Sequence, residues 1–257
     1  MSGFGVLLGK ELAEAWRTRR LVAVALLFTV VGIVSPLTAR YMNEILAATL
    51  AGQLPIALPD PTAATAIEQL SKNLGQLGAL AAIALAMGSI AGELDRGTAA
   101  LVLAQPVGRG AFIAAKAIAL AAVLGIATLA GVSIAALYTS VLFEALPIGG
   151  WLAYAALSWL ALVAWASVTL AASALTGSSM AAAGAGFVAM IGLSLASVAP
   201  AADRWLPTGL GSQAARLALG DTAGLEVDRL ATAVAGSVVL IAGCWVGAWL
   251  AFGRREL

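Results

Sequence analysis

Charged side chains that could form a binding surface gather in one short stretch of this chain. The stretch covers residues 92–116, GELDRGTAALVLAQPVGRGAFIAAK, and lies between two strongly apolar segments. It carries the charged residues Glu93, Asp95, Arg96, Arg109 and Lys116. Leu101 and Leu103 add an apolar anchor, and an apolar anchor inside a charged rim is typical of protein docking sites. The stretch therefore predicts contact with another protein.

Catalytic chemistry finds little support in the sequence. The chain has no histidine, and its one cysteine, Cys244, lies within an apolar run. These counts exclude Ser–His pairs, disulfide frameworks and most metal sites. A serine–lysine hydrolase would need a lysine at membrane depth, and Lys116 borders a predicted span, but we interpret Lys116 as an interfacial lysine that reaches the polar boundary. The sequence thus predicts no catalytic, cofactor-binding or metal-binding residue in this chain.

The docking stretch is predicted to contain one short helix. Gly97 interrupts any helix that continues from the preceding apolar segment. Thr98 can cap the next helix, because its hydroxyl can accept hydrogen bonds from backbone N–H groups. The following residues tolerate a helix as far as Gln105, and Pro106 ends it, since proline lacks the N–H for the next bond. A short rigid helix held between two apolar segments is the result.

The composition is that of a membrane protein. Of 257 residues, 61% are hydrophobic and 11% are charged, and a soluble domain of this length has nowhere to bury so much apolar surface. The net charge of +1 lacks the basic excess that a phosphate-binding surface requires. We therefore expect a membrane-embedded chain and no nucleic-acid partner.

Six uncharged segments are long enough to cross a membrane. About 20 helical residues, each rising ~1.5 Å, span ~30 Å of hydrocarbon. The predicted spans are 21–39, 74–92, 117–143, 151–175, 180–200 and 230–252. Within residues 1–20, Phe4 to Arg17 form an amphipathic pattern that predicts a helix lying along the membrane surface. The predicted fold is an all-α polytopic membrane protein, with an interfacial helix at 1–20 and one six-span domain at 21–257.

Basic residues predict the orientation. If both termini are cytoplasmic, nine of the fourteen lysines and arginines lie on the cytoplasmic side, as the positive-inside rule requires. Segments 40–73 and 201–229 are then external, and the loop 93–116 is cytoplasmic. Residues 210–219 could form a short helix, within an external segment that we otherwise interpret as solvated surface.

The interior of the spans is predicted to carry no charged side chains. The six spans contain no charged residue, which disfavours an ion-driven carrier, because ion pathways use ionisable groups at depth. Four glycines at helical spacing are interpreted as close-packing positions: Gly88, Gly92, Gly243 and Gly247. Trp151 and Tyr154 are interpreted as interfacial aromatic residues.

The charged stretch resembles a known family. Glu93, Arg96-Gly97-Thr98, Leu101, Leu103, Pro106, Arg109 and Lys116 stand at the spacing of the first cytoplasmic loop in permease subunits of ABC transporters of the ABC type-2 family. The amphipathic first helix, the six spans and the enlarged last external segment also resemble that family. The resemblance implies that this loop holds a coupling helix, docked on an ATPase subunit through Glu93, Asp95, Arg96, Gly97, Thr98, Leu101, Leu103, Pro106 and Arg109.

The resemblance also implies partners. It predicts two ABC ATPase subunits that bind ATP and Mg, a second permease that is identical or related, and a prokaryotic plasma (inner) membrane. Export is expected from the family, and the mild polar residues of the predicted spans favour an amphiphilic or lipid-like substrate over a bare ion. Two alternatives remain open: an accessory permease for metalloenzyme maturation or peptide immunity, and a non-transporting membrane scaffold or sensor.

Overall fold

The computed structural model describes residues 3–50, 60–98, 108–221 and 224–253, and every regular element in these ranges is a helix. The helices are α1 (Gly3–Arg17), α2 (Arg20–Arg40), α3 (Met42–Leu50), α4 (Ala63–Met87), α5 (Ala91–Asp95), α7 (Arg109–Leu142), α8 (Ile148–Thr176), α9 (Ser179–Ala196), α10 (Pro200–Asp203), α11 (Gly209–Ala218) and α12 (Val227–Gly253). Six helical segments are long and apolar enough to cross a membrane: 20–40, 63–95, 109–142, 148–176, 179–196 and 227–253. The predicted all-α fold with six spans is confirmed.

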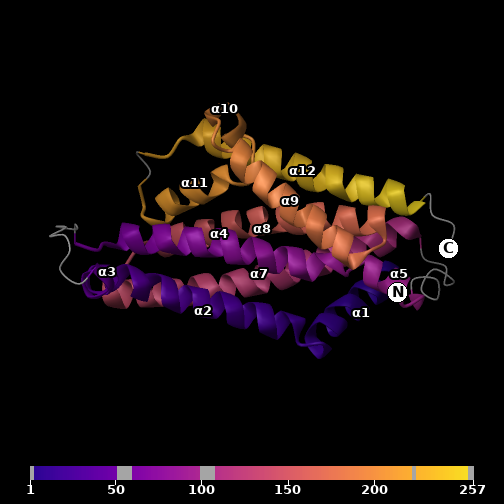
Figure 1. Ribbon diagram of the computed structural model, residues 1–257, viewed down its shortest axis with the longest axis horizontal. Helices are drawn as coiled ribbons and strands as arrows, with labels where there is room; N and C mark the ends of the chain where they lie inside the picture. The colour runs from indigo at the N-terminus through magenta and orange to yellow at the C-terminus, as the bar shows by residue number, and fades with distance from the viewer. Residues whose placement is uncertain (1–2, 51–59, 99–107, 222–223, 254–257) are drawn as a thin grey trace.

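Helix α8 lies at the centre of the bundle. It packs against α4, α7, α9, α11 and α12, while α2 packs against α7 and α4. Helices α1 and α5 and the last turns of α12 lie at one end of the bundle, and α3 lies at the other (Figure 1). We call these the α1 end and the α3 end. The predicted docking stretch and the amphipathic first helix therefore share one end of the molecule.

Helices α2 and α7 approach each other closely. A Cβ atom added to Gly32 would lie 2.3 Å from the carbonyl oxygen of Gly131, and one added to Gly131 would lie 2.6 Å from that of Phe28. Glycine at both positions lets the two backbones approach, as small residues do in membrane bundles. An added Cβ at Gly243 or at Gly247 would meet nothing within 4 Å.

The glycine prediction was therefore wrong in its positions. At Gly88 and Gly92 an added Cβ would meet only one side-chain atom each, at 3.8 Å. Spacing along a helix places two glycines on one face, but it does not say whether another helix covers that face. Helices α9 and α12 are mostly uncovered in the described chain, which is why the α12 glycines pack against nothing.

Two helices begin earlier than the predicted spans. Helix α4 begins at Ala63, where Thr62 and Thr65 form a capping box, with the Thr62 N–H donating to the Thr65 hydroxyl at 3.0 Å. Helix α7 begins at Arg109, so the last part of the predicted loop 93–116 is helical. Hydropathy locates the apolar part of a helix, whereas caps and turns locate its ends.

The second segment that was predicted to be external is part of the packed bundle. Helix α11 confirms the helix predicted at 210–219, but it packs against α8 and α4 instead of forming solvated surface. A Cβ on Gly150 would lie 2.2 Å from the Leu217 carbonyl oxygen, so α11 sits directly on the first turns of α8. Trp151 and Tyr154 are consequently buried, and their interpretation as interfacial residues was wrong.

Candidate functional site at the base of the docking stretch

The docking stretch begins at a break in the second membrane-spanning segment. Helix α4 ends at Met87, and the five-residue helix α5 follows from Ala91. The hydroxyl of Ser173, on α8, donates to the Met87 carbonyl at 2.8 Å and accepts from the N–H groups of Ala91 at 3.0 Å and Ile90 at 3.4 Å. A serine hydroxyl offers one donor and two acceptor sites, and all are used here. The break is thus fixed to the central helix.

Helix α5 turns Glu93 into the bundle. Its side chain is 5% exposed, and its Oε1 atom accepts hydrogen bonds from Lys116 Nζ and Lys10 Nζ, both at 2.8 Å. Lys116 comes from α7 and Lys10 from α1. The sequence prediction placed Glu93 on a surface offered to a partner, but the structure gives this carboxylate an internal role, because it pairs with two lysines of other helices.

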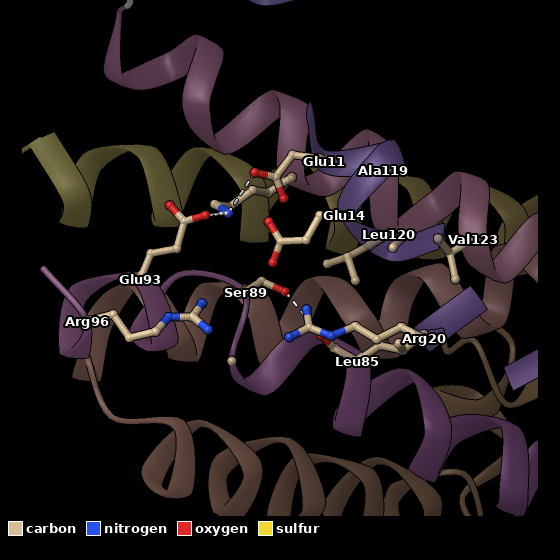
Figure 2. A pocket seen from close by; sticks show the side chains of 13 residues that line it. Glu11, Glu14, Arg20, Leu85, Ser89, Glu93, Arg96, Ala119, Leu120 and Val123 are labelled. Carbon is tan, nitrogen blue, oxygen red and sulfur yellow. Dashed lines mark hydrogen bonds and ion pairs between the residues drawn. The ribbon is translucent and has the colours of Figure 1, made fainter. Parts of the chain in front are cut away.

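Four charged groups close into a ring. Glu11 Oε1 lies 3.0 Å from Lys116 Nζ and 3.1 Å from Lys10 Nζ, so each of the two lysines contacts both Glu11 and Glu93. We call Lys10, Glu11, Glu93 and Lys116 the ion-pair ring. The carboxylates of Glu11 and Glu93 converge from different helices (Figure 2). The ring has no net charge, and it joins α1, α5 and α7 through their side chains.

Lys116 is a buried residue of a membrane-spanning helix. Its side chain is 3% exposed, and its ammonium group lies 4.9 Å from the centre of the Phe112 ring, which stacks on Phe252 of α12 at 5.2 Å. The interpretation of Lys116 as an interfacial lysine was wrong, because α7 begins at Arg109 and carries it about two turns into the bundle. A buried ammonium group is tolerated when it is paired and hydrogen-bonded, as here.

The ring places two charged residues within helical segments that were predicted to be uncharged spans. Lys116 and Glu93 both lie within segments that are apolar and long enough to cross the membrane. They were assigned to the loop because each lies just outside the run of apolar residues. Their charges cancel at close range, so the ring is electrically a neutral element.

Lys10 is the ring member outside the membrane-spanning segments. Burial works against its charge, but the hydrogen bond to Glu93 and the attraction of Glu11 and Glu93 outweigh this and raise the pKa of Lys10 above its ordinary value of 10.5. A raised lysine pKa contributes stability that is fully present below pH 10.5 and is lost as the pH rises through the folded-state pKa. Titration of Lys10 therefore leaves the ring intact throughout the neutral range.

The carboxylates of Glu11, Glu14 and Glu93 have oxygens within 4.8 Å of one another, a spacing that could hold a metal ion. The ammonium groups of Lys10 and Lys116 already lie among these oxygens and supply the positive charge. The adjoining cavity measures about 40 Å³, which is room for about one or two waters. The arrangement is suited to holding three helices together and leaves no room for an organic ligand.

Two of the predicted docking residues lie on the surface beside the ring. Asp95 and Arg96 are exposed at the end of α5, and Arg96 also borders the small cavity together with Arg20 and Ser89 (Figure 2). Gly97 follows with φ +69°, a left-handed conformation that glycine adopts without strain, and its N–H donates to the Leu94 carbonyl at 3.0 Å. The predicted helix break at Gly97 is confirmed.

The remaining docking residues divide into two groups. The Thr98 hydroxyl donates back to the Glu93 carbonyl at 3.3 Å, and the Arg109 guanidinium donates to the Gly253 carbonyl at the end of α12. Leu101, Leu103 and Pro106, with the forward cap predicted for Thr98, lie outside the described residues. The described part of the stretch is therefore tied to the bundle at both of its ends.

Sequence reasoning missed Lys10 and Glu11 as site residues. It interpreted residues 4–17 as an amphipathic helix along the membrane surface with its apolar side among the acyl chains, whereas Glu11 pairs with Lys116 of α7 and Leu7 is buried. The available signal was a lysine, Lys116, followed by a long uncharged run and preceded by six residues that tolerate a helix. A lysine in that position needs a carboxylate partner, but only the fold shows that the partners are Glu11 and Glu93.

Comparison with known proteins gives consistent results. The family model described as ABC-2 family transporter protein matches residues 6–204. The chain is similar to the uncharacterized transmembrane protein YxlG of Bacillus subtilis (strain 168), with 30% identity over 217 residues, covering 83% of this chain and 84% of the relative. It is also similar to the probable ABC transporter permease protein NosY of Stutzerimonas stutzeri, with 34% identity over 142 residues, covering 54% of this chain and 46% of the relative.

Proposed function

The chain belongs to the ABC-2 transporter family and is a multi-pass membrane permease subunit, and from this premise we propose that it is an exporter driven through residues 93–109 by a separate ATPase subunit. Permeases of this family work with ATPase subunits. ATP and Mg would be bound by that partner, and this chain would supply the membrane path. The bacterial relatives point to the plasma membrane.

The observation that carries the proposal is the connection between the exposed docking residues and the ion-pair ring. Arg96 and Asp95 follow Glu93 by only two or three residues, within or next to the single helical turn of α5. A displacement applied to α5 would reach α1 and α7 through Glu93 and would reach α8 through Ser173. Packed and ion-paired elements pass on such shifts as rigid bodies, because they do not deform continuously.

The charge pattern of the interior favours an amphiphilic or lipid-like substrate. Among the described residues, Glu93 and Lys116 are the charged side chains in the buried class, and they neutralise each other. A chain of ionisable groups crossing the bundle would be needed for an ion relay. A substrate path through the bundle would therefore be lined by hydroxyl-bearing and apolar side chains.

The assembly we propose contains a second permease, identical or related, and two ATPase subunits. Helices α9 and α12 keep large apolar side chains exposed, among them Val188 and Val239. In a membrane such faces are covered by hydrocarbon or by a partner helix. They leave ample surface for a permease partner without disturbing the ion-pair ring.

The test compares Arg96→Glu with a matched charge reversal, Arg40→Glu, at the exposed C-terminal end of α2 beside α3. Each variant is purified from membranes together with whichever ATPase subunit accompanies the wild-type chain. Arg96→Glu should lower the recovered ATPase subunit by about tenfold, the equivalent of ~1.4 kcal/mol of binding, with unchanged membrane insertion. Arg40→Glu should have no effect. Equal recovery in both variants would contradict docking through Arg96.

A second readout separates a transporter from a scaffold or sensor. ATP hydrolysis by the recovered subunit is measured in liposomes with and without this chain. A permease should raise hydrolysis, because its substrate cycle is linked to that of the ATPase. Hydrolysis that is indifferent to the chain, despite stable binding, would favour the scaffold alternative.

A further inference from the structure

A second, larger cavity lies between α4, α8, α9 and α11, away from the ion-pair ring. Its volume is about 610 Å³, within the range of ~300–1,000 Å³ that is usual for small-molecule sites. Along α8 its lining runs from Tyr154 to Trp165, which at ~1.5 Å per residue is a length of about 16 Å. The cavity is therefore elongated along the axis of α8.

The end of the cavity that is nearer the α3 end is polar. Tyr154 and Ser71 share a hydrogen bond between their hydroxyl oxygens at 3.0 Å, and Ser158 is a further partner of the Tyr154 hydroxyl. Ser194 and Thr208 add hydroxyl groups from α9 and from the residue before α11. The Ser71 hydroxyl already donates to the Ile67 carbonyl and the Thr208 hydroxyl to the Asp203 carboxylate, so these oxygens are offered to a polar head group as acceptors.

The opposite end of the cavity is apolar. Leu80, Leu162, Trp165 and Met190 line it, and each lies further toward the α1 end along its helix than the polar residues of the same helix. Leu74 and Leu195 add apolar contacts at the polar end, so the hydroxyl groups gather at one end of a lining that is otherwise hydrocarbon-like. A ligand that matches both ends must itself have a polar head and an apolar tail.

Charge contributes little to this selection. Lys72 borders the cavity, but it is 63% exposed and its ammonium group lies 2.8 Å from the Glu68 carboxylate. The pair is neutral as a unit and open to solvent screening. The head group is therefore chosen by hydrogen bonding and not by net charge.

We infer that this cavity binds one single-chain amphiphile, with its hydrogen-bonding head between Tyr154 and Thr208 and its tail against Trp165. The inference rests on the proposed function and gives it a substrate site within one permease chain. A helix from a second copy is a poor occupant, because the hydroxyl-rich end would meet the apolar faces that α9 and α12 expose.

The test fills the cavity without disturbing the fold. Gly75 lines it, and a Cβ added there meets nothing within 4 Å, so Gly75→Leu should place its side chain in the cavity. Gly243→Leu on α12 is the matched control, because an added Cβ there also meets nothing within 4 Å and Gly243 is not part of the lining. Both changes replace glycine within a helix, which favours the helix.

The probe is lysophosphatidylcholine with a diazirine on its acyl chain, added to the protein in nanodiscs, since a single-chain detergent would itself compete. After illumination, labelled peptides are located by mass spectrometry. We expect saturable labelling near Leu162 and Met190, reduced about tenfold by Gly75→Leu and unchanged by Gly243→Leu. Equal labelling in the wild type and Gly75→Leu, or labelling that never saturates, would overturn the inference.

The occupant is tested separately. Gln76 lines the cavity and is exposed, so Gln76→Cys reports whether a second copy covers it: rapid disulfide-linked dimer formation in the membrane would also overturn the inference. Neither measurement needs an ATPase subunit. A failed labelling experiment would thus leave the proposed ATPase coupling standing, and failed ATPase stimulation would leave the amphiphile site standing.

Discussion

The ion-pair ring and the large cavity are two polar regions of one bundle, built in opposite ways. In the ring, each of two lysines lies 2.8–3.1 Å from both of two carboxylates, beside a cavity of about 40 Å³. In the large cavity, hydroxyl groups at one end and apolar side chains elsewhere line about 610 Å³ of space. The first region holds helices together, and the second leaves room between them.

The contrast follows from what each kind of side chain costs to bury. A charge removed from water must be paired closely, so it draws helices into one fixed arrangement. A serine or threonine can satisfy its hydroxyl on its own helix, as Ser71 does with the Ile67 carbonyl at 2.8 Å, and so tolerates an open space beside it. The function proposed above would use both kinds of region, a rigid one beside the docking residues and an open one for the substrate.

The largest effect is expected from breaking the ring. Lys116→Met removes one lysine and leaves Glu11 and Glu93 with only Lys10 between them, so the folded state should lose about 3–5 kcal/mol. The double variant Glu93→Met, Lys116→Met should recover most of this loss, because it leaves the neutral Lys10–Glu11 pair. Unfolding in lipid–detergent mixtures measures both.

The matched control is an ion pair of equal length on the surface. Lys72 and Glu68 are also 2.8 Å apart, but their side chains are 63% and 65% exposed, so Lys72→Met should cost at most about 1 kcal/mol. Similar losses for Lys116→Met and Lys72→Met would mean that the ring adds no more than a surface pair, which would remove the contrast drawn above.

The next largest effect separates tight from open packing. In Gly32→Ala the new Cβ would lie 2.3 Å from a backbone oxygen of α7, and forcing the α2–α7 pair apart should cost about 1–3 kcal/mol. In Gly75→Ala the new Cβ enters the large cavity, and the helix should gain about 0.5–1 kcal/mol. If the melting temperature falls in Gly32→Ala and rises in Gly75→Ala, the assignment of the two regions is supported. Changes of the same sign in both variants would refute it.

A smaller and more local effect is expected at the break between α4 and α5. Ser173→Ala removes one donor and an acceptor for two N–H groups, and unsatisfied buried groups cost about 1–3 kcal/mol. Hydrogen exchange should accelerate at the amides of Ile90 and Ala91. Ser140→Ala serves as the control, because its exposed hydroxyl donates only to Leu137 of its own helix, and exchange at the break should not change.

Much of the fold could be predicted from the sequence, because membrane spans can be recognised by their length and hydropathy. Helix α2, predicted as 21–39, is found at Arg20–Arg40, and α8, predicted as 151–175, at Ile148–Thr176. The break at Gly97 was also readable, since glycine is the residue that tolerates φ +69°. Local chemistry was sufficient in each of these cases.

The pairing of distant side chains could not be predicted in the same way. Glu11 and Lys116 are 105 positions apart along the chain, and they meet only because α1 packs on α7. Likewise, Tyr154 looked interfacial until α11 covered the start of α8. Amphipathic patterns say that a face will be covered, but a single sequence does not say by which helix.

The most direct test asks whether the ion-pair ring transmits the displacement of the docking stretch by the ATPase to the membrane helices. The double variant Glu93→Met, Lys116→Met is reconstituted in liposomes with the ATPase subunit, and both binding and stimulated ATP hydrolysis are measured against the wild type. The account predicts that binding is retained, because Asp95 and Arg96 are unchanged, while stimulation falls by about tenfold. Full stimulation in the double variant would contradict the claim that the ring links the docking stretch to the membrane helices.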